Sequence, residues 1–179
     1  MTEFAKLILD GQELELPVIE GSEGEKAIDI RNLRQQTGHI TFDPGFGNTG
    51  VCRSGITFMN GEKGILRYRG YPIEDLAEHS TFVETAFLLI TGQLPTQDEL
   101  IRTSVDLNDF SSLHENMRAF YQHYPSKAHP MGILSAMVNA LRSFYPELID
   151  APEEMNKTYL RLISKIRTMA AMAYRISKG

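Results

Sequence analysis

The start of the chain alternates between hydrophobic and polar positions in the way that β-strands require. The run Leu7–Leu9 is followed by Asp10-Gly11, and Leu14 and Leu16 then recur at alternate positions. An Asp-Gly pair is preferred in the two-residue turn of a β-hairpin, because both residues accept the positive φ angles that such a turn needs. The pattern therefore predicts an amino-terminal β-hairpin.

A second alternating region begins near residue 56. Ile56 and Phe58 precede the glycine-containing segment 60–64, and Ile65 and Arg67 follow it in the same alternation. A connection of this length that contains glycine is typical of a hairpin loop. We therefore predict a second β-hairpin here.

From Pro72 onward the hydrophobic period becomes helical. Proline cannot donate a ladder hydrogen bond but suits the first turn of a helix, so the strand should end there and a helix should begin at Ile73. Gly92 is expected to end a later helix in the left-handed conformation. Three helix starts are predicted by capping boxes, in which a hydroxyl precedes a glutamate by three positions: Thr81 with Glu84, Thr96 with Glu99, and Ser112 with Glu115.

Two further helices are unusually hydrophobic. Residues 130–144 are apolar on nearly every side, which predicts a helix buried all round. Residues 152–177 are expected to bury one stripe, made of Tyr159, Leu162, Ile163, Ile166, Met169, Ala170 and Ala173. The chain should therefore have a mainly α fold with a small amino-terminal β-hairpin region. We place the boundary between a β-rich region, 1–70, and a helical region, 71–179.

Composition and charge narrow the functional classes. The chain is 42% hydrophobic and 23% charged, and it has no run of about 18 apolar residues that could cross a bilayer. Glu3 and Lys6 lie in a strand-like pattern rather than in a signal peptide. A single cysteine, Cys52, excludes an internal disulfide and favours a reducing, cytoplasmic location. The net charge of -5 argues against a nucleic-acid partner.

The histidines and a glycine-rich segment offer no convincing catalytic or metal site. His39, His79 and His123 have no carboxylate or second histidine at ligand spacing, so no metal is expected. His114, beside Glu115, and His129, before Pro130, are interpreted as structural donors. The segment 45–50 matches G-x-G-x-x-G, but no helix is expected to begin within it, so we interpret it as a turn rather than a dinucleotide loop.

Several phrases then carry a family resemblance. They are FDPGF at 42–46, GILRYRGYPIEDLA at 64–77, PTQ at 95–97, HPM at 129–131 and RLISKIRTMAAMAY at 161–174. In this order they resemble the citrate synthase family in its longer bacterial form, over almost the whole chain. The resemblance implies part of the large domain of an enzyme that condenses acetyl-CoA with oxaloacetate to citrate and CoA in the tricarboxylic acid cycle. Acetyl-CoA would be a co-substrate, and no cofactor is implied.

The same resemblance implies that no catalytic residue lies in this chain. In the family, two histidines and an aspartate act downstream of anything present here. We therefore expect an amino-terminal fragment that is inactive by itself. Two alternatives remain open at this point: a fragment of a 2-methylcitrate synthase, or a non-catalytic helical scaffold or regulatory subunit.

A regulatory nucleotide site is also implied. In regulated bacterial members an NADH site uses a tyrosine, an arginine and a lysine that align with Tyr145, Arg161 and Lys165. Those members also supply an Arg-His-Thr run, which aligns here with Asp109-Phe110-Ser111. An aspartate near a pyrophosphate repels it, so this departure weakens the predicted site.

Self-association is the last implication. The helices at 130–144 and 152–177 resemble members of the layer at the subunit interface of the family. Small residues in the second helix, Ala170, Ala171 and Ala173, would allow another helix to approach closely. We therefore expect a homo-oligomer that forms through these two helices.

Overall fold

The computed structural model describes residues 3–146 and 155–178, and it divides the chain into two compact units, Met1–Arg53 and Ser54–Gly179. This division differs from the boundary that we placed at residue 70 from the alternation of hydrophobic residues. The second hairpin belongs with the helices because Arg69, which follows it, donates from Nη2 to the carbonyl oxygen of Leu89 at 2.7 Å. Alternation reports the type of element, whereas compactness depends on contacts of this kind.

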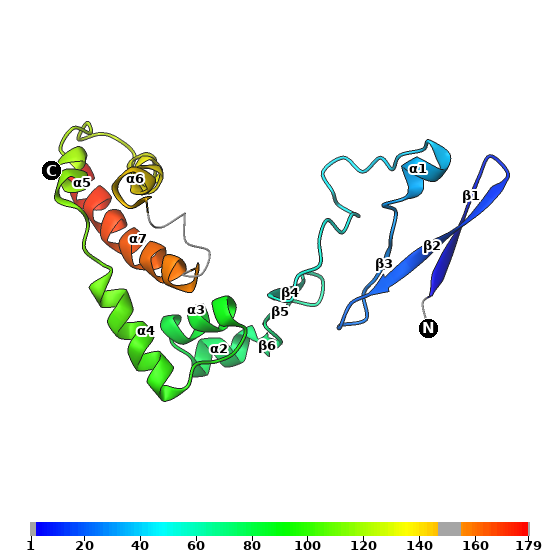
Figure 1. The fold of residues 1–179 in the computed structure, drawn as a ribbon, viewed down its shortest axis with the longest axis horizontal. Coiled ribbons are helices and arrows are strands. Elements are labelled where there is room, and N and C mark those ends of the chain that lie inside the picture. The colour runs from blue at the N-terminus through cyan, green and yellow to red at the C-terminus, as the bar shows by residue number, and fades with distance from the viewer. Residues whose placement is uncertain (1–2, 147–154, 179) are drawn as a thin grey trace. The chain divides into compact units, whose positions relative to one another are not determined.

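Unit 1 is a small antiparallel sheet with one short helix (Figure 1). Its strands are β1 (Phe4–Leu9), β2 (Gln12–Glu20) and β3 (Lys26–Ile28), in the order β1-β2-β3, and its helix is α1 (Leu33–Thr37). Asp10 and Gly11 connect β1 to β2 with φ angles of 50° and 80°. The predicted amino-terminal hairpin is thus confirmed.

Unit 2 begins with the second predicted hairpin, which is also confirmed. Strand β4 (Thr57–Asn60) pairs antiparallel with β5 (Ile65–Tyr68), and β5 then pairs with the short β6 (Tyr71–Pro72). Arg69 and Gly70 turn the chain between β5 and β6 with φ angles of 51° and 91°. The short β6 ends at Pro72, where we expected the proline to end the strand, and the next helix begins at Ile73 as predicted.

Four helices follow: α2 (Ile73–His79), α3 (Phe82–Thr91), α4 (Gln97–Asp109) and α5 (Glu115–Tyr121). The capping boxes at Thr81 and Thr96 are confirmed. Gly92 ends α3 with φ of 92°, also as predicted. The box predicted at Ser112 is wrong, because His114 caps α5 by accepting a hydrogen bond from the amide of Asn116.

The two hydrophobic helices are α6 (Pro130–Phe144) and α7 (Met155–Lys178). They pack with α5 at one end of unit 2 and enclose its core (Figure 1). Met117, Tyr121, Met137 and Met169 are fully buried there, each 0% exposed. The mainly α fold is therefore confirmed, whereas the predicted helix residues 152–154 lie outside the described part.

The predicted burial of these two helices needs correction. Helix α6 is not buried all round in this chain, because Met131 is 61% exposed while Ile133 on another face is 1% exposed. On α7, Tyr159 and Ile166 were expected to be buried but are 41% and 38% exposed. Ser164 and Lys165 are buried in their place. The face of a long helix that becomes buried depends on its neighbours, and at Ser164 and Lys165 those neighbours are backbone carbonyl groups.

Candidate functional site

Two of the residues predicted to bind a nucleotide, Tyr145 and Lys165, contact each other. Lys165 lies on α7 and is only 6% exposed. Its ammonium nitrogen is 4.0 Å from the centroid of the Tyr145 ring, and Tyr145 is the residue that directly follows α6. An ammonium over an aromatic face is attracted by the quadrupole of the ring, more strongly when both are shielded from water.

The third predicted residue, Arg161, lies over a different ring. Its guanidinium carbon is 5.0 Å from the centroid of Phe110. Phe110 begins the segment 110–114 between α4 and α5, which we call the connector. The structure thus brings all three predicted residues to the connector or to a residue that contacts it.

Backbone carbonyl groups of the connector accept hydrogen bonds from the ammonium group of Lys165. The ammonium group donates to the carbonyl oxygens of Phe110 and Ser112, at 3.1 and 2.7 Å. Hydrogen bonds from a charged donor are shorter and stronger than neutral ones, so these two contacts hold the connector firmly to α7. They also mean that a bound anion would compete with two carbonyl groups for this ammonium.

The hydroxyl of Tyr145 is bonded to the same segment. It accepts from the backbone amide of His114 at 2.6 Å and donates to the carbonyl oxygen of Ser112 at 3.4 Å. Tyr145 therefore joins the end of α6 to the start of α5. Both its ring and its hydroxyl group are engaged within the chain.

Asp109 is the last residue of α4 and is exposed directly beside the connector. The carboxyl end of a helix carries partial negative charge, and an aspartate there adds to it. Both features oppose the binding of an anionic nucleotide. Nucleotide binding by Tyr145, Arg161 and Lys165 stays a prediction, and the charge at Asp109 weighs against it.

Sequence reasoning missed three polar residues of α7 that act at the same place. Ser164 donates to the carbonyl oxygen of Leu107, Arg167 donates to the same oxygen at 2.8 Å, and Thr168 donates to that of Ser111 at 3.0 Å. The signal that could have found them is positional. Ser164, Lys165 and Thr168 lie three and four residues apart, so they share a helix face.

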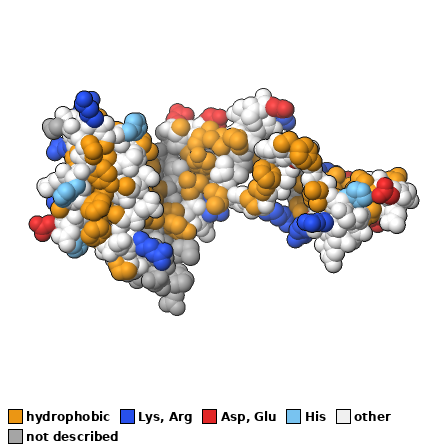
Figure 2. Space-filling view, turned by 90° about the horizontal axis from the view of Figure 1, so that it is seen from above, with side chains coloured by type: hydrophobic (Ala, Val, Ile, Leu, Met, Phe, Trp, Pro, Cys, Tyr) orange, Lys and Arg blue, Asp and Glu red, His pale blue; other side chains and the backbone are white. Residues whose placement is uncertain are grey.

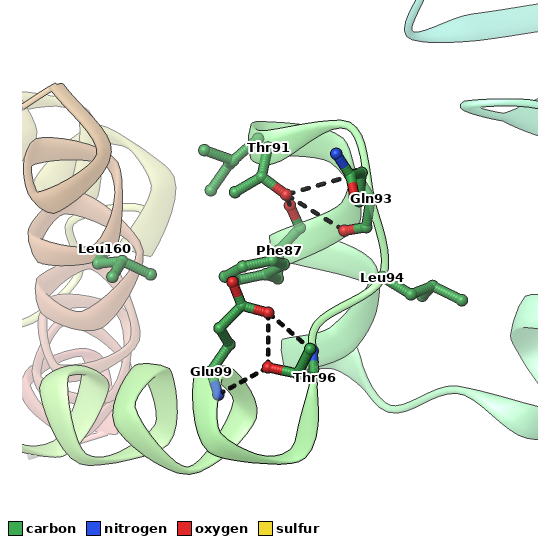
Figure 3. Close-up of a pocket in the computed structure, with 8 residues that line it drawn as sticks. Phe87, Thr91, Gln93, Leu94, Thr96, Glu99 and Leu160 are labelled. Carbon is green, nitrogen blue, oxygen red and sulfur yellow. Dashed lines mark hydrogen bonds between the residues drawn. The ribbon is translucent and has the colours of Figure 1, made fainter.

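A cavity of about 430 Å³ lies elsewhere in unit 2, between α3, the start of α4 and α7 (Figure 3). Its apolar lining includes Phe87 and Leu94, with Leu160 facing it from α7. At its lower edge the capping box of Thr96 and Glu99 closes the first turn of α4 (Figure 3). No feature of the sequence had pointed to this cavity.

The one carboxylate among the residues that line this cavity is already used structurally. The backbone amide and the hydroxyl of Thr96 each donate to Glu99 at 2.8 Å, and these two bonds lower the pKa of the Glu99 carboxyl. A carboxylate with a lowered pKa is a weak base. The cavity therefore offers an apolar surface rather than acid–base chemistry.

The two histidines that flank helix starts have structural roles, although as acceptors rather than donors. The Nδ1 atoms of His114 and His129 accept from the amides of Asn116 and Met131, both at 3.2 Å. They therefore act as N-caps of α5 and α6. Neither ring is paired with a carboxylate as a catalytic base would be, as far as the described residues show.

The described part of the chain offers neither a metal-binding cluster nor a membrane-spanning helix. Across residues 3–146 and 155–178, no group of three or more His, Cys, Asp or Glu side chains could hold a metal ion. Within the same ranges no helix has the length and hydrophobicity to cross a membrane.

The glycine-rich segment 45–50 folds as a turn around Asp43, whose carboxylate accepts from the amide of Asn48 at 2.9 Å, and the next regular element is β4.

Comparison with known proteins gives a consistent result. Residues 45–179 match the family model described as "Citrate synthase, C-terminal domain". Citrate synthase 1 of Mycobacterium tuberculosis is 42% identical over 98% of this chain. The match covers 41% of that protein, so the chain spans less than half the length of this relative.

Solved structures agree with the sequence matches. A citrate synthase from Pyrobaculum aerophilum is 30% identical, with a TM-score of 0.68 over 90% of this chain and 39% of its own. A citrate synthase from Thermotoga maritima is 32% identical, with a TM-score of 0.66 over 78% of this chain and 36% of its own. The mainly α fold described above is therefore one that known enzymes share.

Proposed function

The chain belongs to the citrate synthase family, and from this we propose that it is the amino-terminal part of an enzyme that condenses acetyl-CoA with oxaloacetate to form citrate and CoA. The observation that carries the proposal is the match along 98% of the chain to a citrate synthase more than twice as long. The single cysteine, which is free and exposed, is compatible with a cytoplasmic location.

The catalytic groups are proposed to lie outside this chain. His114 and His129 cap helices, and His123 lies 3.2 Å from the carbonyl oxygen of Ala119. His39 and Asp10 approach to 3.6 Å but are 46% and 84% exposed, so they lack the enclosed setting in which acid–base catalysis is effective. This chain would supply framework, and the remaining polypeptide would supply the reacting groups.

Release of the CoA thiol tests this proposal. With acetyl-CoA and oxaloacetate, the full-length protein should release thiol, and residues 1–179 alone should release none. Turnover by residues 1–179 alone would show that the active site has been misplaced. Turnover by the full-length protein with propionyl-CoA in preference to acetyl-CoA would favour a 2-methylcitrate synthase, and no turnover with either would favour a scaffold or regulatory subunit.

We also propose that the protein self-associates through α6 and α7. Hydrophobic side chains gather on the outer surface of the end of unit 2 that holds these helices (Figure 2). Met131 is 61% exposed on α6, and Tyr159 and Tyr174 are 41% and 59% exposed on α7. Exposed apolar surface of this kind is typical of subunit interfaces.

Light scattering after size-exclusion chromatography tests the interface. Met131→Glu combined with Val138→Glu places two charges on the exposed side of α6 and should shift the full-length protein toward monomer. Met59→Glu is the control, because Met59 is 72% exposed on β4, outside the proposed interface. A protein that is monomeric before any substitution would contradict the proposal.

A further inference from the structure

Helix α3 is apolar on nearly every side. Apart from Glu84, Thr85 and Thr91, each of its 10 residues is apolar, yet Leu88 alone is buried, at 0% exposure. A helix that is hydrophobic all round is normally covered on all sides, inside a large protein or a bilayer. With 10 residues α3 is too short to cross a bilayer. Its neighbours among the described residues therefore cover only part of the surface that its sequence prepares for burial.

The incompletely covered side of α3 borders the cavity of about 430 Å³. Leu160 of α7 points toward Phe87 of α3 across it (Figure 3). None of the residues that line the cavity is buried, and Thr91, Gln93 and Leu94 are exposed. Apolar side chains that face each other and stay open to water are typical of an interaction surface. The cavity is thus an open apolar recess, in contrast to the closed core between α5, α6 and α7.

The size and shape of this surface select the kind of partner. Phe82 begins α3 outside the cavity lining and is 71% exposed, so a small molecule seated in the cavity would leave that ring in water. A second copy related by a two-fold axis would present the same recess, and a concave surface does not fill itself. A convex apolar segment of polypeptide from elsewhere fits both features.

We propose that an apolar segment of the polypeptide that follows residue 179 packs on α3 and inserts side chains between Phe87 and Leu160. This inference rests on the proposed function, under which the chain is one part of a longer polypeptide. The matched relative has only 41% of its length covered by this chain, so more than half of such a polypeptide is available to supply the segment. Burial of apolar surface on both partners stabilises the contact. The recess would then join the framework in this chain to the part that holds the reacting groups.

Thiol labelling of the full-length protein tests whether the recess is covered. Thr91→Cys replaces an exposed hydroxyl group of the recess by a thiol of similar size, and Thr57→Cys is the matched control, exposed on β4 outside the lining. With iodoacetamide, read by mass spectrometry of peptides, Thr91→Cys should react at least about a hundredfold more slowly than Thr57→Cys, because a covered thiol reacts only when its cover opens locally. Equal rates would overturn the proposal. If Thr91→Cys fails to fold, Leu160→Cys is read in the same way.

Photo-cross-linking identifies the cover. With p-benzoylphenylalanine in place of Gln93, illumination of the full-length protein should link the recess to a peptide beyond residue 179, in a band with the mass of one chain. A band with the mass of two chains, or protection of Thr91→Cys that disappears on dilution, would assign the cover to a second copy and overturn the proposal. Links confined to residues 1–179 would overturn it as well. Thiol release by the unsubstituted full-length protein decides the proposed function separately, because neither reading here depends on turnover.

Discussion

Helix α7 is held at two neighbouring places by opposite kinds of contact. Near Met169 it packs into an apolar core with Tyr121 and Met137, all 0% exposed. One turn earlier, Ser164 donates to the carbonyl oxygen of Leu107 in α4, and Lys165 donates to that of Ser112 in the connector. The apolar contact needs volume and shape, whereas the polar contact needs particular atoms at particular distances. The two places should therefore respond differently to substitution.

The largest effect is expected in the apolar core. Met137→Ala should lower the free energy of unfolding by about 3 kcal/mol, because it removes buried methylene and sulfur atoms and leaves a cavity. Met59→Ala, at a position that is 72% exposed, should change it by less than about 0.5 kcal/mol. Urea unfolding of both variants measures the difference. Equal values would mean that the methionine core contributes little.

Tyr121 joins the two kinds of contact, because its ring is buried in the core and its hydroxyl donates a hydrogen bond to the carbonyl oxygen of Met169 at 3.2 Å. Burial raises the pKa of the Tyr121 hydroxyl to about 12, with a smaller contribution from Tyr124. The phenol therefore ionises at lower pH in the unfolded chain than in the folded one. The contribution of the neutral Tyr121 to the free energy of unfolding is complete below about pH 10 and is lost as the pH rises toward 12.

The expected slope is a loss of about 1.4 kcal/mol per pH unit across that window. Tyr121→Phe should remove this part of the pH dependence, and at neutral pH it should cost about 1 kcal/mol for the lost hydrogen bond. Unfolding free energies measured from pH 9 to pH 12 check both. An identical pH profile in Tyr121→Phe would contradict the assignment.

A single hydroxyl of α7 that bonds the end of α4 should matter less than a core methionine. Ser164→Ala should lower the free energy of unfolding by about 1 kcal/mol, because Leu107 keeps its bond from Arg167. Ser177→Ala, in the last turn of α7, serves as a control near zero, since the hydroxyl of Ser177 donates locally, to the carbonyl oxygen of Tyr174 in the same helix. Thermal unfolding of the two variants would show the difference. A loss for Ser164→Ala as large as that for Met137→Ala would erase the distinction between the two places.

The smallest effect is expected from NADH. Lys165 donates to two carbonyl oxygens and lies 4.0 Å from the Tyr145 ring, and Asp109 adds negative charge nearby. NADH titrated into the full-length protein should therefore leave both the initial rate and the nicotinamide fluorescence unchanged. Saturable inhibition that Lys165→Met abolishes would show instead that the ligand displaces the connector from α7.

The predictions that held are those that depend on neighbouring residues in the sequence. The turn at Asp10-Gly11, the capping boxes at Thr81 and Thr96, and the end of α3 at Gly92 are local, and each was confirmed. The local rule failed at Ser112, because its carbonyl group is taken by Lys165 and Tyr145 and the next helix starts later, after His114. A distant partner overrode a local capping signal.

The candidate site shows the same limit. Family resemblance pointed to Tyr145, Arg161 and Lys165, and the structure brings them to the connector. The resemblance could not show that carbonyl groups of the connector accept hydrogen bonds from Lys165, or that Ser164 and Thr168 donate hydrogen bonds beside it. The type and position of a polar residue on a mainly apolar helix face do not identify its hydrogen-bond partner. Here that partner lies more than 50 positions earlier in the sequence.

The sequence by itself determined the two long hairpins and the longer helices, many of their ends, and the family to which the chain belongs. These properties follow from turn chemistry, capping and hydrophobic period, which act over a few residues. Only the tertiary structure decided which face of α7 is buried and what Lys165 binds. Those outcomes depend on which backbone groups of α4 and the connector come within hydrogen-bond distance of α7, and that distance exists only once the chain has folded.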